Sequence, residues 1–401
     1  MEKSTVREIG ELKGKRVFLR ADLNVPQDDN GKITDDTRIR ESLATLRFCI
    51  EKGARVVLCS HLGRPKSKED KQWSLKPVAE RLKELLKGVK VTLANDCIGT
   101  EVEKQVAALE DGQVLLLENI RFYKEETSND PKFAKQLAGF ADYYINDAFG
   151  AAHRAHASTE GITKFLPAVA GFLLEKEIKI LGESVNNPKR PLTVIIGGKK
   201  IGDKIPVIDN LLKIADAIII GGGMTYTFVK AQGGEIGNSI VDASKVDYCR
   251  DVIKAAKDAG VKLLLSLDTV AADNFAPDAN TKIVDVYKIP EGWEGLDIGP
   301  KTIENMKKVI KDSGTIIWCG PLGVSEFEIF ANGTREIAKA ITDTKAVTIV
   351  GGGDSASAVV RLGYGDKFTH ISTGGGASLE LLEGKILPGV AALYDMGVKI
   401  K

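Results

Sequence analysis

Leu192-Thr-Val-Ile-Ile-Gly-Gly-Lys-Lys-Ile-Gly-Asp-Lys204 joins a short apolar run to a glycine-rich turn that carries lysines. Such a run, rich in Val and Ile, is typical of a strand that is buried on both faces of a parallel sheet. Ligands of parallel sheets bind where the strands end, at their carboxyl edge. The stretch therefore predicts an α/β fold, and it also indicates where the functional residues of that fold should be sought.

The same unit recurs along the chain on both sides of this stretch. Helical spacing of apolar residues is visible between the runs, for example in Pro77–Leu86 and Val252–Ala259. Strands that alternate with helices predict doubly wound parallel sheets. The other predicted strands are Val17–Arg20, Val56–Cys59, Val114–Leu117, Tyr143–Asn146, Ala217–Ile220, Val261–Leu265, Thr315–Trp318 and Val347–Val350.

The length of 401 residues predicts two or three domains, at roughly 150 residues each. The boundary is expected between Lys164 and Pro191. The segment from Phe165 to Leu181 reads as one long helix that ends near Asn186, where prolines follow. A helix is thus expected to join two lobes.

Composition excludes several classes of protein. Lys and Arg number 56 against 55 Asp and Glu, so the chain lacks the basic excess of nucleic-acid or membrane-surface proteins. No stretch approaches the roughly 18 apolar residues of a membrane span, and the N-terminus does not resemble a signal peptide. The five cysteines form no C-x-x-C pair and are expected to be free, buried thiols in the cytoplasm.

Arginine and histidine follow the predicted strands of the first half. Arg38 and Arg40 come soon after Arg20–Pro26, the segment that follows the first predicted strand. Several converging arginines would form a pocket for a phosphate or carboxylate, because the guanidinium binds such groups bidentately. A metal site at His61, His153 and His156 is the alternative, but no helical H-x-x-x-H with acidic ligands accompanies them. The segments are Arg20–Pro26, Ser60–Pro65, Glu118–Phe122 and Asp147–His156.

Glycine follows the predicted strands of the second half. Glycine turns let the backbone approach a phosphate, and the helix that follows offers free N–H groups. No G-x-x-x-x-G-K-[ST] motif is present, so a P-loop is excluded. Asp354 could cap a helix or, beside a triphosphate, hold magnesium. The turns lie at Gly197–Lys204, Gly221–Met224, Gly320–Glu326, Gly351–Ala356 and Gly374–Ser378.

These patterns indicate phosphoryl transfer between a nucleotide and a small anionic metabolite. They leave open a small-molecule kinase with some carboxylate substrate, a non-catalytic anion-binding protein and an NAD-dependent dehydrogenase. The dehydrogenase would use Gly351–Ala356, which fits the dinucleotide fingerprint, but no acidic strand end follows about 20 residues later.

Six motifs resemble the phosphoglycerate kinase family, in the family's order. Ser60–Pro65 matches S-H-L-G-R-P and Asp147–His156 matches D-A-F-G-x-A-H-R-A-H. The other matches are Arg20–Pro26, Gly197–Ile205, Gly351–Ala358 and Ser372–Lys385.

The resemblance implies two Rossmann-like, doubly wound parallel-sheet domains joined by a long helix, with a cleft between them. It implies a substrate domain at 1–170 plus 382–401, an interdomain helix and linker at 171–190, and a nucleotide domain at 191–381. It also implies a monomeric, hinge-bending, cytoplasmic enzyme of glycolysis, which transfers the acyl phosphate of 1,3-bisphosphoglycerate to MgADP and gives 3-phosphoglycerate and ATP.

The resemblance also implies a role for particular residues. Arg38 and Lys200 would act on the transferring group, and Asp354 would hold Mg²⁺. Phosphoglycerate would be bound by Asp22, Asn24, Arg38, His61, Arg64, Arg121 and Arg154. The nucleotide would be bound by Lys204, Gly299, Glu326, Gly353, Asp354 and Ser355.

Four positions depart from the family's motifs. Cys319 stands where the family has asparagine, which removes an amide near the nucleotide. Lys199 replaces a small residue, and Ser325 replaces an aromatic one. These three are expected to alter nucleotide affinity, whereas Ser355 in place of threonine keeps the hydroxyl.

Overall fold

The computed structural model describes residues 2–199, 201–398 and 400. Clustering of the backbone divides the chain into two compact units. Unit 1 comprises Met1–Lys179 and Ile386–Lys401, and unit 2 comprises Ile180–Lys385.

Unit 1 is built on a parallel sheet of six strands within the described residues, in the order β3-β4-β2-β1-β5-β6. Its central strands are buried on both faces, as the unbroken apolar runs predicted. The strands are β1 (Arg16–Ala21), β2 (Arg55–Cys59), β3 (Val91–Leu93), β4 (Val114–Leu116), β5 (Tyr143–Asp147) and β6 (Ala168–Ala170).

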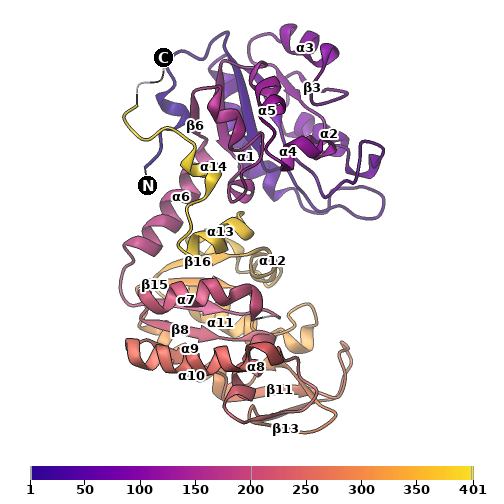
Figure 1. The fold of residues 1–401 in the computed structure, drawn as a ribbon. Coiled ribbons are helices and arrows are strands. Elements are labelled where there is room, and N and C mark those ends of the chain that lie inside the picture. The colour runs from indigo at the N-terminus through magenta and orange to yellow at the C-terminus, as the bar shows by residue number, and fades with distance from the viewer. Residues whose placement is uncertain (1, 200, 399, 401) are drawn as a thin grey trace. The chain divides into compact units, whose positions relative to one another are not determined.

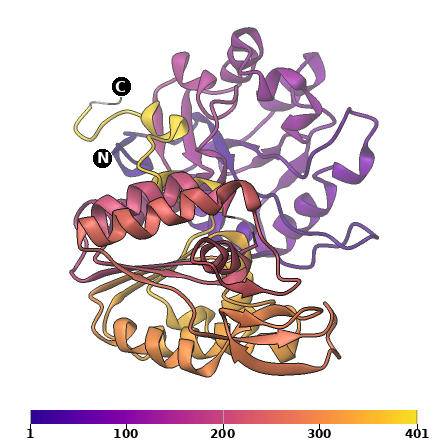
Figure 2. The same ribbon diagram turned by 60° about the horizontal axis from the view of Figure 1, so that its bottom comes forward.

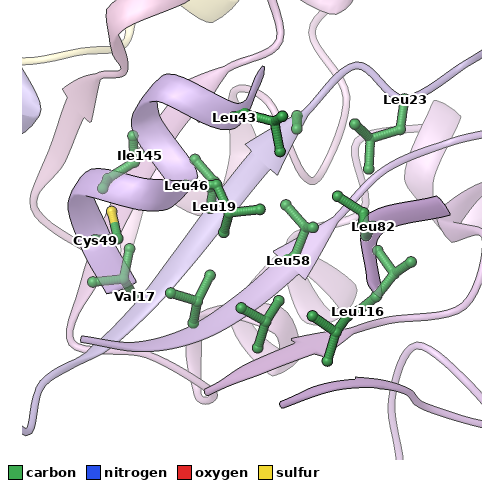
Figure 3. Close-up of a cluster of buried hydrophobic side chains, with 14 of the residues drawn as sticks. Val17, Leu19, Leu23, Leu43, Leu46, Cys49, Leu58, Leu82, Leu116 and Ile145 are labelled. Atoms are coloured by element: carbon green, nitrogen blue, oxygen red, sulfur yellow. The ribbon is translucent and has the colours of Figure 1, made fainter. Parts of the chain in front are cut away.

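One face of this sheet forms a core with helices α1 and α2. Figure 3 shows Val17 and Leu19 of β1 beside Leu58 of β2, with Leu46 of α1 packed over them. All four side chains are at most 1% exposed, so they have left water almost completely. The helices of the unit are α1 (Thr37–Glu51), α2 (Lys76–Leu85), α3 (Thr100–Ala107), α4 (Lys124–Thr127), α5 (Pro131–Ala138) and α14 (Pro388–Ala391).

The helix expected from Phe165 begins later, so that part of the prediction is wrong. Ala168–Ala170 forms β6, paired with β5, and α6 runs from Phe172 to Asn186. Pro167 lacks an N–H and biases the residue before it towards an extended backbone, which favours the strand. The predicted end at Asn186 is confirmed, and α6 crosses the boundary between the units.

Unit 2 is built on a second parallel sheet, again six-stranded within the described residues, in the order β10-β8-β7-β15-β16-β17. The strand order reverses at β7, whose neighbours are β8 and β15. The strands are β7 (Leu192–Ile196), β8 (Ala217–Ile220), β10 (Lys262–Leu264), β15 (Thr315–Cys319), β16 (Val347–Gly351) and β17 (His370–Ile371).

Helices cover both faces of this second sheet, with α7 and α9 on one face and α10 and α11 on the other (Figure 2). The doubly wound α/β class predicted from the sequence is thereby confirmed in both units. The helices are α7 (Ile205–Ile214), α8 (Thr225–Ala231), α9 (Val246–Ala259), α10 (Pro300–Lys311), α11 (Asn332–Thr342), α12 (Gly353–Arg361) and α13 (Gly376–Leu382).

Two small sheets in unit 2 were not predicted. An antiparallel sheet has the order β12-β11-β14, and β9 pairs with β13. Their strands are β9 (Glu235–Ile236), β11 (Asp268–Ala272), β12 (Thr281–Asp285), β13 (Lys288–Ile289) and β14 (Glu294–Ile298).

The last segment of the chain packs within unit 1. Asn146 Nδ2 donates to the Gly389 carbonyl at 2.9 Å, and the Tyr394 N–H donates to the Ala168 carbonyl at 2.9 Å. Figure 1 shows α14 beside β6 accordingly. Residues far apart in the sequence thus complete one unit.

All five cysteines are free and buried, as expected. Within the described part of the chain, no helix is both long enough and apolar enough to span a membrane.

Candidate active site

In unit 1 the candidate residues lie where the central strands end. β1 pairs with β2 on one side and with β5 on the other, and all three run parallel. The segments after Ala21, Cys59 and Asp147 therefore emerge at the same edge of the sheet. The predicted arginines and histidines are attached to these segments or follow close behind.

Asp22 and Asn24, just after β1, hold neighbouring predicted residues. Asp22 is 8% exposed, and its Oδ2 accepts from Arg38 Nη1 at 2.7 Å. Asn24 Oδ1 accepts from the Gly63 N–H at 2.7 Å. Asp22 thus fixes Arg38 in the first turn of α1, and Asn24 fixes the backbone at Gly63.

Three of the predicted arginines line one cavity of about 740 Å³. Arg121 also donates from Nη1 to the Gly63 carbonyl at 2.9 Å. Burial lowers the pKa of Arg121, the nearby charges of Arg20 and Arg154 lower it as well, and the result is a pKa of about 10. A pocket whose cations repel each other in this way favours an anionic occupant. The three arginines are Arg64, Arg121 and Arg154.

His61 lies against the same positive cluster. It is 5% exposed, and burial lowers its pKa well below the ordinary value. The charges of Arg20, Arg121 and Arg38 lower the pKa in the same direction. His61 is therefore neutral, and it can take part in binding as a hydrogen-bonding group rather than as a cation.

Arg20 begins the first of the predicted strand-end segments but was not among the predicted binding residues, and it is only 1% exposed. Its Nη2 lies 3.0 Å from His61 Nδ1, and its Nε donates to Ser158 Oγ at 2.9 Å. Ser158 in turn donates to the fully buried carboxylate of Glu126. The one visible signal in the sequence was an arginine that interrupts the apolar run of β1.

In unit 2 the glycine turns after β7 and β15 meet at the point where the strand order reverses. A Cβ on Gly197 would lie 2.1 Å from the Pro321 carbonyl oxygen. Gly320, at φ +97°, would place a Cβ 2.3 Å from the Gly197 carbonyl oxygen. Packing alone therefore requires these two glycines, which bring the turns after β7 and β15 close together at the switch point.

Gly353 is different, because packing does not explain it. A Cβ there would meet nothing within 4 Å. The residue is exposed and opens α12, whose first N–H groups have no helical partner. A glycine with open space in front of a helix N-terminus is suited to the close approach of a phosphate.

Asp354 and Ser355 follow Gly353 but have different surroundings. Asp354 is exposed, and its carboxylate has no hydrogen-bond partner among the described residues. Ser355 is buried; it accepts from the Gly320 N–H at 3.0 Å and donates to the Gly351 carbonyl. Ser355 therefore joins two turns, whereas Asp354 is free to bind a ligand.

The other predicted nucleotide residues are spread around the sheet. Gly299 caps α10, and a Cβ there would lie 2.4 Å from the Asp268 carboxyl carbon, which explains the glycine. Lys204 precedes α7 and acts electrostatically on Cys319, while Glu326 is exposed. Lys200 lies outside the described residues.

The departures from the family motifs also have defined surroundings. Cys319 ends β15, is 1% exposed and has its pKa raised to about 11 by burial. Ser325 is buried, and its Oγ accepts from Arg361 Nη2 at 3.1 Å. Lys199 is exposed.

A magnesium ion bound with a nucleotide fits this donor set. Among residues 2–199, 201–398 and 400, no group of three His, Cys, Asp or Glu side chains could form a metal site of protein ligands alone. Mg²⁺ is commonly held by one or two carboxylates together with phosphate oxygens. The exposed carboxylate of Asp354, at a helix N-terminus with open space in front of it, is suited to this arrangement.

Comparison with known proteins gives one consistent result. The family model described as phosphoglycerate kinase matches residues 6–385. The chain is 59% identical over 399 residues to the cytosolic phosphoglycerate kinase of Triticum aestivum, which covers 98% of this chain and 99% of that protein. It is 56% identical over 401 residues to a chloroplastic phosphoglycerate kinase of Arabidopsis thaliana, with 98% and 84% covered.

Solved structures agree with the sequence comparison. The phosphoglycerate kinase of Coxiella burnetii superposes with a TM-score of 0.87 at 39% identity, covering 97% of this chain and 98% of that one. That of Pyrococcus horikoshii superposes with a TM-score of 0.84 at 32% identity and the same coverage.

Proposed function

Because the chain belongs to the phosphoglycerate kinase family, we propose that unit 1 binds the phosphoglycerate and unit 2 the nucleotide. The chain is a phosphotransferase of glycolysis, which reversibly transfers the acyl phosphate of 1,3-bisphosphoglycerate to ADP and gives 3-phosphoglycerate and ATP. The observation that carries the proposal is the cavity of unit 1 that Arg64, Arg121 and Arg154 line together.

The anion pocket of unit 1 suits a small molecule with a phosphate and a carboxylate. Arginine forks bind both groups bidentately, and the mutual repulsion of the cations is relieved by an anion. Asp22 supports this by holding Arg38. The proposed binding residues are Asp22, Asn24, Arg38, His61, Arg64, Arg121 and Arg154.

The glycine turns of unit 2 suit the phosphates of ADP or ATP. Gly353 supports this assignment best, because its lack of a side chain serves no packing purpose. Ser355 also holds the turn in place, through its bonds to Gly320 and Gly351. The proposed set is Lys204, Gly299, Glu326, Gly353, Asp354 and Ser355.

Asp354 is the proposed magnesium ligand. When bound with the nucleotide, Mg²⁺ would neutralise charge on the phosphate oxygens. The chain's own contribution is one free carboxylate and the N–H groups at the start of α12.

The chemistry needs no general base. The attacking atom is a phosphate oxygen in one direction and a carboxylate oxygen in the other, and both are ionised at neutral pH. Catalysis then consists of alignment and of stabilising charge on the transferring group. We assign these roles to Arg38, which Asp22 holds in place, and to Lys200, which lies outside the described residues.

The proposal extends to the state of the enzyme in the cell. We place it in the cytoplasm as a hinge-bending monomer that acts on small molecules, with no nucleic-acid or membrane partner. A cytosolic relative at 59% identity and the near-zero net charge support this. The proposed domains are residues 1–170 with 382–401, the helix and linker at 171–190, and 191–381.

Steady-state kinetics tests how the substrates are divided between the units. Arg121→Ala should raise KM for 3-phosphoglycerate and leave KM for ATP nearly unchanged, whereas Lys204→Ala should do the reverse. Arg47→Ala, which removes an exposed arginine on the same helix as Arg38, is the matched control. The assignment fails if Arg121→Ala and Lys204→Ala affect the same substrate.

Direct assay of ATP-dependent phosphorylation of 3-phosphoglycerate tests the reaction itself. Activity should be lost when magnesium is chelated, and it should not depend on a nicotinamide cofactor. Activity that requires NAD would instead support the dehydrogenase alternative.

A further inference from the structure

Arg20 is the centre of a buried chain of hydrogen bonds in unit 1. It lies near the end of β1 and is 1% exposed. Its Nη2 contacts His61 Nδ1 at 3.0 Å, its Nε contacts Ser158 Oγ at 2.9 Å, and its Nη1 contacts the Ala21 carbonyl. Every nitrogen of the guanidinium is therefore engaged inside the protein.

The chemistry of arginine fixes the direction of the contact with His61. A guanidinium has five N–H donors and no acceptor, and it stays protonated. His61 Nδ1 must then accept, and a neutral imidazole that accepts at Nδ1 carries its proton on Nε2. We propose that Arg20 is a positioning residue that holds His61 as the neutral Nε2–H tautomer, so that His61 donates to an anionic oxygen of the substrate.

The Nε2 of His61 is available for that role. Among the residues that the structure describes, no hydrogen-bond partner of this atom is present. The inference rests on the proposed binding of phosphoglycerate at His61, because the free Nε2–H is a useful donor only if an anion occupies the pocket.

Ser158 and Glu126 form the other end of this series of hydrogen bonds. Ser158 Oγ accepts from Arg20, so its own proton is free to go to Glu126 Oε1, 2.7 Å away. Glu126 Oε2 accepts from the Ser158 N–H at 2.9 Å. The carboxylate thus receives two donors through one serine, which also orients the guanidinium.

The charge of Glu126 balances that of Arg20. Burial alone would raise the pKa of Glu126, but His156, Arg20 and Ser158 hold it below the ordinary value. Glu126 is accordingly ionised. A buried guanidinium without such a partner would be strongly unfavourable, so Glu126 stabilises Arg20 in the position that sets the His61 tautomer.

The charged and titratable groups that act most strongly on His61 are basic and come from several elements. Arg20 lies on β1, Arg38 on α1, Arg121 just after β4, and His156 after β5. Burial and these groups together lower the pKa of His61, so protonation is opposed from every side. A neutral donor adds a hydrogen bond to the pocket without adding to the repulsion among its cations.

Nuclear magnetic resonance of the full-length protein tests the tautomer directly. The imidazole nitrogens of the four histidines are labelled with ¹⁵N, and His61 is assigned by the signal lost in His61→Gln. Nδ1 should resonate as an unprotonated nitrogen and Nε2 as a protonated one, unchanged from about pH 5 to 8, where a free histidine titrates. A proton on Nδ1, or titration of His61 in this range, would overturn the proposal.

Ser158→Ala tests whether the hydrogen bonds through Ser158 position Arg20. The variant should let the His61 tautomers exchange and should raise KM for 3-phosphoglycerate by about tenfold, the scale of one hydrogen bond to a charged group. The KM should become pH-dependent, while kcat should change less. Ser42→Ala is the matched control, because it removes a buried hydroxyl of the same unit that bonds only to the Ile39 carbonyl.

The outcomes separate the two proposals. A folded Ser158→Ala variant with the wild-type tautomer and wild-type KM would contradict the positioning role. If Ser158→Ala does not fold, the spectrum of the wild-type protein still decides the tautomer. If the wild-type protein shows the expected tautomer but KM for 3-phosphoglycerate is insensitive to His61→Gln, the site assignment fails instead.

Discussion

Single residues in the anion pocket act through the partners that hold them. Arg38 reaches Asp22 at 2.7 Å, and the carboxylate is almost buried while the guanidinium is partly exposed. The aspartate therefore fixes the direction of the arginine and leaves the guanidinium accessible to a ligand. A charge fixed before the substrate arrives needs no reorganisation during the reaction, which is how such a group contributes most to catalysis.

Replacement of the two proposed catalytic cations should be severe. Arg38→Ala and Lys200→Ala are each expected to lower kcat by at least about a hundredfold, the scale of losing one preorganised donor. Lys199→Ala, its neighbour, is the control and should lose less. Steady-state kinetics at saturating substrate measures the effect. Retention of most of kcat by either variant would remove that residue from the mechanism, and an equal loss in Lys199→Ala would mean that the wrong lysine was chosen.

The nucleotide affinity should respond to Cys319. The thiol is buried at the end of β15 and is influenced by Lys204. Cys319→Asn restores an amide and is expected to tighten ADP binding by roughly two- to tenfold, the scale of one hydrogen bond. Isothermal calorimetry measures the change. Cys319→Ala is the control and should not tighten binding, so equal affinities of the two variants would contradict the expectation.

The predictable part of the site consisted of residues at strand ends. Arg64, Arg121 and Arg154 could be predicted because each follows an apolar run, and the structure gathers them around one cavity. Arg20 and Glu126 could not be predicted. A buried charge is recognisable only through its partner, and Glu126 is 106 residues from Arg20 along the chain. Local sequence carries no sign that the two share Ser158.

Helices of both units are held by buried aspartates that come from strands. Asp147 Oδ1 accepts from the Leu173 N–H at the start of α6. Asp297 Oδ2 accepts from the Gly333 N–H at the start of α11, at 2.7 Å. A glycine makes room in each case, because a Cβ on Gly171 or Gly333 would lie within 2.3 Å of the carboxylate. Each pair fixes the first turn of a helix.

Because the folded protein favours the protonated form of Asp297, unit 2 should be more stable at low pH than at high pH. Burial raises its pKa from 3.8 to about 7, although the Gly333 and Ile298 N–H groups oppose the shift. The folded state then holds the proton more tightly than the unfolded state does. The contribution of the Asp297 carboxyl to stability is complete below about pH 4 and is lost as the pH rises through about 7. Between pH 5 and 8 the loss should be on the order of 2 kcal/mol.

Asp297→Asn should remove this part of the pH dependence. Urea unfolding of the wild type and the variant, followed by tryptophan fluorescence, compares their free energies of unfolding at pH 5 and 8. Trp293 and Trp318 belong to unit 2, and a Trp73→Phe background removes the signal of the third tryptophan, which lies in unit 1. Asp278→Asn, at an exposed aspartate, is the control and should keep the wild-type slope. An unchanged slope in Asp297→Asn would contradict the role assigned to its carboxyl.

The main strands could be predicted because they are buried on both faces. Leu192–Ile196 and Ala217–Ile220 have the bounds expected from their apolar runs. β6 was read as helix, because Ala and Val fit either structure and its pairing with β5 lies outside the local sequence. β12 was not predicted because it contains no run of buried apolar residues. Its exposed residues alternate with half-buried ones, and three of its residues, Thr281, Lys282 and Asp285, are polar.

At the scale of the whole molecule, two sheets of the same class present different chemistry. Unit 1 ends its strands in arginine and histidine, and unit 2 ends them in glycine. The chain passes from one unit to the other through α6 and rejoins unit 1 at Ile386. Each proposed substrate thus belongs to a different compact unit, although phosphoryl transfer requires the reacting atoms to be about 3 Å apart.

Binding of both substrates should therefore compact the protein in solution. Each ligand alone contacts mainly one unit, so it can favour a closed state only weakly. Both together gain contacts that exist only when the units approach. Small-angle X-ray scattering should show a smaller radius of gyration with 3-phosphoglycerate and a non-hydrolysable ATP analogue than with either alone. Arg38→Ala, which lacks a cation at the transferring group, should compact less. An unchanged radius of gyration in the wild-type ternary complex would contradict closure. It would also contradict direct transfer, because the reacting atoms of the two substrates would then have no means of coming into contact.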